Sequence, residues 1–134
     1  MVKLFLILLF LHLLADFTLQ GLFGPLKQKD WWLKEFKSGC TWTTYEGLVR
    51  FYGKDYRVAN AGHALYWTLI TFAPLWLWCE SNWWIVGIVG LNAIFHYVVD
   101  DLKANAHRIN LIHDQFLHLV QIAVTFFLWK GFAV

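Results

Sequence analysis

The sequence predicts an all-α membrane protein with four transmembrane helices and an amphipathic interfacial segment after the first. Two observations predict this class. Of the 134 residues, 59% are hydrophobic and 15% are charged, whereas soluble domains carry about 25% charged residues. The apolar residues also gather in four runs, each close to the ~20 residues that a spanning helix needs. The net charge of +2 is too small to indicate nucleic acid binding.

The four runs are expected to cross the membrane as one domain covering residues 1–134. They lie at about residues 2–22, 59–79, 83–100 and 115–132. The first run is interpreted as a retained helix, because it lacks a small-residue cleavage site and carries His12 and Asp16. Pro74 is expected to kink the second helix. The short turn at 80–82 predicts that the second and third helices form an antiparallel hairpin.

Residues 24–58 combine lysine and arginine with many aromatic side chains. This composition suits the headgroup layer of a bilayer, where cationic and aromatic side chains both settle. A soluble loop and a substrate-gating lid are the alternatives. Nine of the eleven lysine and arginine residues lie in segments 24–58 and 101–114. Because loops rich in these residues stay in the cytoplasm, both segments are expected there, with both termini outside.

Three pairs of histidine and aspartate, each four residues apart, lie in or beside the apolar runs. The pairs are His12/Asp16, His96/Asp100 and, in reverse order, Asp114/His118. Residues four apart share a helix face. The run that carries Asp114 and His118 is expected to cross the membrane in the opposite direction to the other two. The reversed order on this run therefore places the three imidazoles at one depth and the three carboxylates at another. Ionisable groups within a membrane are costly, so such a cluster predicts a functional site.

Buried carboxylates repel one another unless a cation compensates their charge. Histidine and aspartate together are ligands for zinc, manganese or iron. We therefore predict one or two divalent ions, with zinc first, held by the three pairs: His12, Asp16, His96, Asp100, Asp114 and His118. Some aspartates could instead orient a histidine ligand. Two ions ~3.5–4 Å apart would activate a water and clamp a phosphoryl or acyl oxygen.

Catalytic and substrate-binding roles follow from the same cluster. An aspartate is expected to serve as a general base, with Asp16, Asp100 and Asp114 as the candidates. His63 lies on the same side of the membrane and is predicted to be a further ligand or an acid. Three polar residues are expected to hold the substrate, namely Gln20, Lys103 and Gln115.

Four strings of sequence carry a resemblance to a known family. They are His-Leu-Leu-Ala-Asp-Phe-Thr-Leu-Gln (12–20), Gly-His-Ala-Leu (62–65), Phe-His-Tyr-Val-Val-Asp-Asp-Leu-Lys (95–103) and His-Asp-Gln-Phe-Leu-His-Leu (113–119). In this order they resemble domain of unknown function 3307, a family of small bacterial and phage membrane proteins. The resemblance implies a multi-pass protein of the bacterial inner membrane and implicates the polar positions in these strings, but it implies no reaction. A more distant likeness is to small membrane proteins classed as metal-dependent hydrolases.

The leading hypothesis is a metal-dependent hydrolase that acts on a lipid or lipid-linked phosphoester at the cytoplasmic leaflet. One alternative is a metal-ion or proton transporter or channel. It would need polar residues in the other half of the membrane, where Thr68, Thr71 and Thr125 are the candidates. A second alternative is a phage or bacterial interaction protein in which the polar cluster holds the helices together. Association into a homo-oligomer is compatible with each hypothesis.

Overall fold

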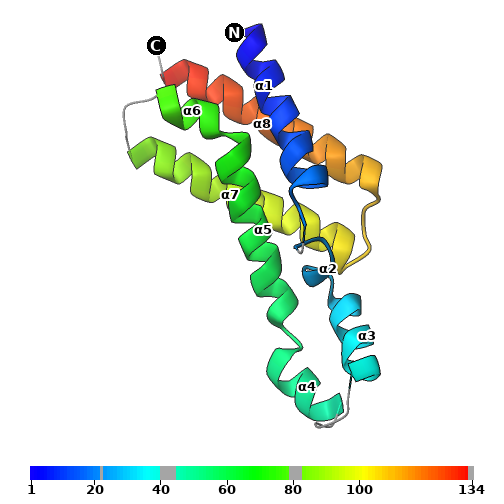
Figure 1. The fold of residues 1–134 in the computed structure, drawn as a ribbon. Coiled ribbons are helices and arrows are strands. Elements are labelled where there is room, and N and C mark those ends of the chain that lie inside the picture. Colours follow the sequence, from blue (N-terminus) through cyan, green and yellow to red (C-terminus); the bar gives the residue numbers. More distant parts are fainter. Residues whose placement is uncertain (22, 40–44, 79–82, 133–134) are drawn as a thin grey trace.

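The computed structural model describes residues 1–21, 23–39, 45–78 and 83–132, and the regular structure in these ranges is helical (Figure 1). The all-α class is therefore confirmed. The elements are α1 (Val2–Leu13), a π-helical turn η1 (Leu14–Thr18), α2 (Phe23–Leu26), α3 (Lys29–Gly39), α4 (Tyr45–Tyr52), α5 (Asp55–Thr71), α6 (Ala73–Trp78), α7 (Trp83–Ala104) and α8 (Leu111–Phe132).

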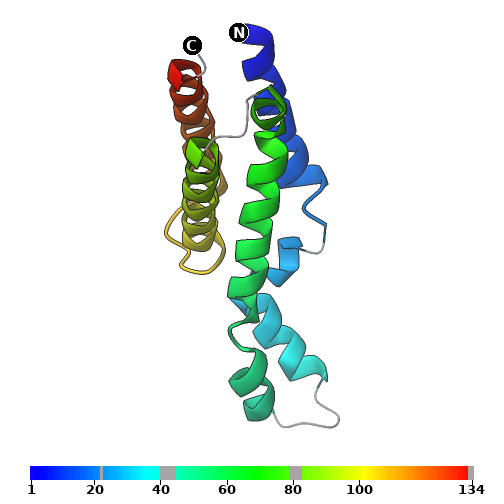
Figure 2. The same ribbon diagram turned by 90° about the vertical axis from the view of Figure 1, so that its left-hand side faces the viewer.

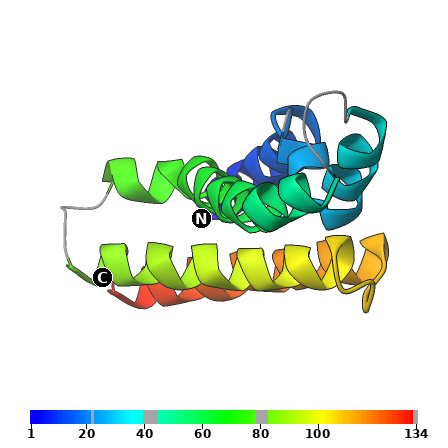
Figure 3. The same ribbon diagram turned by 90° about the horizontal axis from the view of Figure 1, so that it is seen from below.

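The long helices form two layers. Helices α1 and α5 make one layer, and α7 and α8 make the other (Figures 2 and 3). The start of α1 and the end of α8 lie at one end of the molecule, while α3 and α4 project beyond the bundle at the opposite end (Figure 1). The polar residues of the predicted cluster lie where the two layers meet, so the architecture brings together segments that are distant in sequence.

The second apolar run is divided into two helices. Helix α5 begins at Asp55, earlier than the predicted boundary at residue 59, and ends at Thr71. Helix α6 begins at Ala73. The break at Phe72 confirms the kink predicted from Pro74, because a proline removes one helical hydrogen bond and its ring clashes with the preceding turn.

The first apolar run ends earlier than the predicted boundary at residue 22. Its last turn is the π-helical η1, in which the Leu19 amide donates to the Leu14 carbonyl at 2.8 Å. The helical segment ends at Thr18 with Leu19 as its C-cap, and Gly21 then adopts a positive φ of 48°, which glycine tolerates. Gln20 therefore lies beyond the helical segment that carries His12 and Asp16.

One helix of the described residues is long and apolar enough to cross a membrane, Leu111–Gly131 in α8. Helices α1 and α5 are shorter, with 12 and 17 residues. The predicted set of four spans is therefore not supported by helix length and composition, because η1 and the break at Phe72 interrupt two of the runs. A single such helix is weak evidence for membrane association, since a core helix of a soluble protein can have the same properties.

The distribution of polarity is nevertheless inverted relative to a soluble bundle. Large apolar side chains are exposed on the outer faces of the helices, among them Leu91, Ile94, Phe116, Val124 and Phe127. The interior of the described residues contains many polar and charged side chains. Extended exposed apolar surfaces mark a contact with lipid or with another protein.

Candidate metal centre

Seven ionisable side chains from five elements meet in the interior. All are buried, and they are His12 on α1, Asp16 on η1, His63 on α5, His96 and Asp100 on α7, and Asp114 and His118 on α8. The structure thus brings together every histidine and aspartate that the sequence analysis placed in the cluster. Two other histidines lie elsewhere: His107 and His113 are exposed, and they contact Asp30 and Asn110 respectively.

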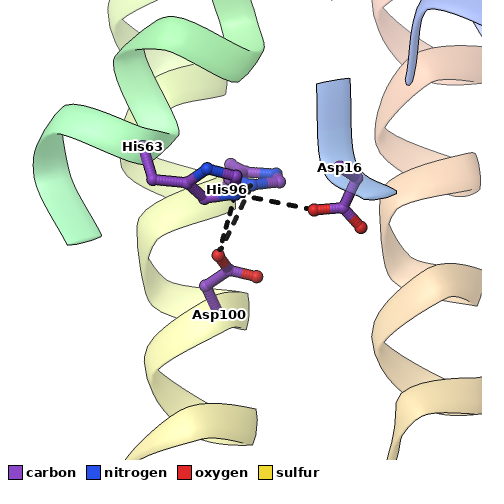
Figure 4. A group of neighbouring side chains, drawn as sticks. All are labelled: Asp16, His63, His96 and Asp100. Atoms are coloured by element: carbon purple, nitrogen blue, oxygen red, sulfur yellow. Dashed lines mark hydrogen bonds and ion pairs between the residues drawn. The ribbon is translucent and has the colours of Figure 1, made fainter. Parts of the chain in front are cut away.

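Four of these residues converge on one point (Figure 4). The Nε2 atom of His63 lies 3.3 Å from Nε2 of His96 and 3.5 Å from Oδ1 of Asp16. The Oδ2 atom of Asp100 lies 3.3 Å from His63 Nε2 and 3.6 Å from His96 Nε2. One ligand-type atom from each residue lies within 4.8 Å of all the others, so this group could hold a metal ion.

A second group adjoins the first and shares Asp16 with it. Its other members are Asp114 and His118, and its ligand-type atoms also lie within 4.8 Å of one another. The Nε2 atom of His118 is 3.4 Å from Oδ1 of Asp114 and 3.7 Å from Oδ1 of Asp100. The two oxygens of Asp100 therefore face different histidines, and the two groups form one continuous cluster.

Two lysines neutralise part of the acidic charge. Lys27, which follows α2 and is 3% exposed, donates to Oδ2 of Asp100. Lys103 on α7 donates to Oδ2 of Asp114. Burial by itself lowers the pKa of Lys103, but the hydrogen bond to Asp114 and the nearby carboxylate charges outweigh burial and raise that pKa. Three carboxylates against two ammonium groups leave one negative charge uncompensated while the imidazoles are neutral.

His12 has a different environment from the other buried histidines. Its Nδ1 accepts a hydrogen bond from Nε1 of Trp67 at 3.0 Å, and its Nε2 donates to Oε1 of Gln115 at 3.1 Å. Both ring nitrogens are therefore engaged by protein groups, and His12 belongs to neither group of converging atoms. Its position favours a role in orienting Gln115 rather than the ligand role predicted from the sequence.

Gln115 joins the carboxylates of Asp16 and Asp114 by hydrogen bonds. Its Nε2 donates to Oδ2 of Asp16 at 2.7 Å and to Oδ2 of Asp114 at 3.0 Å. Because its amide is fully used by His12 and the two aspartates, this geometry favours a positioning role over the predicted contact with substrate. The predicted substrate residues Gln20 and Lys103 both line an adjacent cavity of about 350 Å³.

Trp67 packs against the histidines of the cluster. It is fully buried and stacks on His96, with ring centroids 4.1 Å apart and an interplanar angle of 17°. His96 in turn stacks on His118 at 4.1 Å. This column fixes the imidazole planes. Sequence reasoning missed Trp67, although its position four residues after His63 on the same helix face was a usable signal. It also missed Lys27, for which the sequence offers no comparable pattern.

Each of the three aspartates retains a buried oxygen that accepts no hydrogen bond from the described residues, namely Oδ1 of Asp16, Asp100 and Asp114. Burying a charged oxygen without a compensating partner is costly. These three atoms are the same ones that face His63 or His118 at 3.4–3.7 Å, and Oδ1 of Asp100 also lies 3.9 Å from Nζ of Lys103. A bound cation or a protonated imidazole would compensate their charge.

Neither a protein-family model, nor a curated protein, nor a solved structure matches the chain. The resemblance to domain of unknown function 3307 therefore stays a prediction. A functional proposal for this chain rests on the geometry of the cluster and on the chemistry of its residues.

Proposed function

We propose that the protein is a membrane-bound, metal-dependent hydrolase whose buried cluster of histidines and aspartates holds one or two divalent cations. Zinc is the first candidate, with manganese or iron as alternatives. The proposed substrate is a lipid or lipid-linked phosphoester at the cytoplasmic leaflet. When bound, such a cation activates a water molecule and polarises a phosphoryl oxygen.

The single observation that carries this proposal is the set of separations among Asp16, His63, His96 and Asp100. Ligands of a tetrahedral zinc at bond lengths of about 2.0–2.2 Å stand roughly 3.3–3.6 Å apart, as the geometry of a tetrahedron requires. Four pairs in the cluster are separated by 3.3, 3.3, 3.5 and 3.6 Å. These separations exceed the ~2.7–3.2 Å typical of N–H···O hydrogen bonds, so shared coordination accounts for them better than direct hydrogen bonding.

A second cation is supported by the two carboxylates that face both groups. Asp16 belongs to each group, and Asp100 directs its two oxygens to different histidines. Carboxylates placed in this way can bridge a pair of ions. His118 and Asp114 would complete the second set of ligands, or Asp114 would stay unbound as the candidate general base.

A membrane location for the enzyme is supported by the inverted polarity of the bundle and by the apolar length of α8. We propose that the four apolar runs form a multi-pass bundle in the bacterial inner membrane. Both termini then lie outside, because segments 24–58 and 101–114 contain most of the lysine and arginine. Helices α3 and α4 fall in the first of these segments, and Trp31, Trp32 and Tyr45 suit the headgroup layer.

Hydrolysis can be tested with the full chain reconstituted in liposomes that contain a lipid phosphomonoester, whose hydrolysis releases free phosphate. Zinc or manganese is expected to start phosphate release, and Asp114→Asn is expected to lower the rate by about 100-fold or more, as loss of a general base does. His113→Ala is the matched control, because His113 is exposed and lies on the same helix. Equal rates for Asp114→Asn and the control would refute the assignment.

A structural network of ion pairs is the second candidate function of the cluster. It is favoured by the contacts of Lys27 with Asp100 and of Lys103 with Asp114, which neutralise two carboxylates without any metal. In this case the purified protein would be metal-free and fully stable. Removal of one member of a buried ion pair would then destabilise the fold by roughly 3–5 kcal/mol.

A further inference from the structure

A cavity of about 350 Å³ lies beside the cluster, between η1–α2 and the junction of α7 with α8. Its buried lining is charged and includes Asp16 and Lys27. Its exposed lining includes apolar side chains, since Phe17 and Leu111 are 55% and 53% exposed. The buried part of the cavity is therefore charged, and its opening carries apolar side chains together with the exposed polar residues Gln28 and His107.

Both lysines that contact the cluster also line this cavity. Lys27 reaches Asp100 from one side, and Lys103 reaches Asp114 from the other. The backbone of Lys27 is fixed by Asn105 at the end of α7, whose Nδ2 donates to the Lys27 carbonyl at 3.1 Å. The Oδ1 atom of Asn105 also accepts from the amide of Lys29 at 2.7 Å. Asn105, which follows α7, thus fixes the backbone of Lys27 in the buried part of the cavity.

A cation in the cluster would change the partner of Lys27. The oxygen of Asp100 that accepts from Lys27 is the same Oδ2 that faces His63 and His96. A divalent cation bound to this oxygen would lie close to the Lys27 ammonium, and like charges at such a distance repel. The long flexible stem of lysine allows the ammonium to turn away, and the adjacent space is the cavity.

We propose that this cavity binds the phosphate group of a phosphomonoester between Lys27 and Lys103, and that divalent cations in the cluster strengthen this binding. The inference rests on the proposed metal centre and assigns to Lys27 a role that the sequence did not suggest. Phosphate oxygens accept charge-assisted hydrogen bonds from lysine. The phosphate could belong to a lipid, whose chains would then lie against Phe17 and Leu111, or to a soluble molecule.

The test measures the binding of two probes to the purified full chain, with zinc or with a chelator. The probes are inorganic phosphate and dihexanoyl phosphatidic acid, and metal content is measured separately for every sample. Zinc is expected to tighten binding of the preferred probe by about tenfold or more, the effect of one or more charge-assisted contacts. Tighter binding of the phosphatidic acid identifies a lipid source, and equal binding identifies a soluble one.

Variants separate the inference from the metal proposal. Lys27→Met and Lys103→Met are each expected to weaken probe binding by about tenfold or more while zinc content is unchanged. Lys29→Met is the control, because Lys29 is exposed and does not line the cavity. Zinc uptake with no probe binding, or with probe binding unaffected in both cavity variants, overturns the inference and leaves the metal centre standing. Absence of zinc uptake overturns the metal centre and this inference together.

Discussion

His12 and His63 are both buried histidines on facing helices, yet their surroundings give them different chemistry. The ring nitrogens of His12 are occupied by Trp67 and Gln115. The Nε2 atom of His63 instead faces one histidine and two carboxylates at once. Hydrogen-bond partners therefore distinguish a supporting histidine from a candidate ligand, where burial alone does not.

His12→Ala is expected to leave the metal content unchanged and to lower the free energy of unfolding by about 1–3 kcal/mol, because Trp67 and Gln115 each lose a buried partner. Elemental analysis and thermal unfolding in detergent measure the two effects. His63→Ala serves as the comparison and is expected to lose metal. If His12→Ala lost metal as completely as His63→Ala, His12 would be a ligand after all.

Asn92 organises a second polar group, within the half of the bundle that lies away from the cluster. Its Oδ1 accepts from Nε2 of Gln121 at 2.9 Å and from Oγ1 of Thr125 at 3.0 Å. These bonds join α7 to α8. Because the donors of Gln121 and Thr125 are bonded to Asn92 across the helix contact, the group supports a structural role better than the conducting path of a transporter.

Asn92→Leu is expected to lower the free energy of unfolding by about 1–2 kcal/mol, because the Thr125 hydroxyl loses its acceptor and the Gln121 amide keeps only the backbone carbonyl of residue 92. The double variant Asn92→Leu/Gln121→Leu is expected to recover part of this loss, since both partners are then apolar. Unfolding curves in detergent would reveal this difference. A double variant no more stable than the single one would contradict the structural assignment.

The residue pattern predicted which histidines and aspartates meet, because spacing of four and the reversal in Asp114/His118 are visible in the sequence. It did not predict which atoms face the common point. The roles of His12, Gln115 and Lys27 depend on contacts between segments far apart in the chain, such as the 73-residue separation of Lys27 from Asp100. No local periodicity contains that information.

Helix α2 is short, but it positions Lys27 beside the cluster. It has four residues and leads directly into Lys27. It rests on α5, where Gly62 lies under the ring of Phe23, and a Cβ added at Gly62 would lie 3.2 Å from Phe23 Cε1. The absence of a side chain at Gly62 therefore lets α2 approach the bundle closely enough for Lys27 to reach Asp100.

Gly62→Ala is expected to push α2 away from α5 and to destabilise the fold by about 1–3 kcal/mol, the usual cost of overpacking. Hydrogen exchange of residues 23–28 should increase at the same time. Gly87→Ala on α7 is the matched control, because a Cβ there meets nothing within 4 Å. It is expected to stabilise its helix by about 0.5–1 kcal/mol. Unchanged exchange in Gly62→Ala would contradict the proposed contact.

Helix boundaries were the least predictable part of the elements. The existence of helices over the four apolar runs followed from composition, and the break near Pro74 followed from proline chemistry. The π-helical turn at 14–18 did not, since its residues resemble those of the preceding α1. Asp16 lies within that turn, and π-helical turns often occur at functional sites.

The helical bundle buries a polar cluster beside a small apolar core and exposes large apolar side chains on its outer faces, and this distribution is the basis of the proposed multi-pass topology. Four predicted spans reduce to one candidate by length and composition. Helix α7 is continuous over 22 residues, whereas the first run is interrupted at η1, beside Asp16, and the second run is interrupted after α5. Interrupted helices within a membrane are tolerated where they are buried in protein or line a cavity, which is the case for the cluster described above.

The orientation of the chain can be tested with reporter fusions at the C-terminus. Alkaline phosphatase is active only outside the cytoplasm, and green fluorescent protein matures only inside it. Because most lysine and arginine lie in segments 24–58 and 101–114, the phosphatase fusion is expected to be active and the fluorescent fusion dark. The reverse pattern would place the cluster near the outer face and reject the cytoplasmic orientation.

The proposed metal centre is tested most sharply by measuring the metal content of the purified full chain, combined with X-ray absorption at the metal edge. We expect one or two divalent ions per chain with nitrogen and oxygen ligands at about 2.0–2.2 Å. We also expect their loss in His63→Ala/His96→Ala and their retention in His113→Ala. A metal-free protein that takes up no zinc, manganese or iron and is as stable as the metal-treated sample would contradict the proposed metal centre.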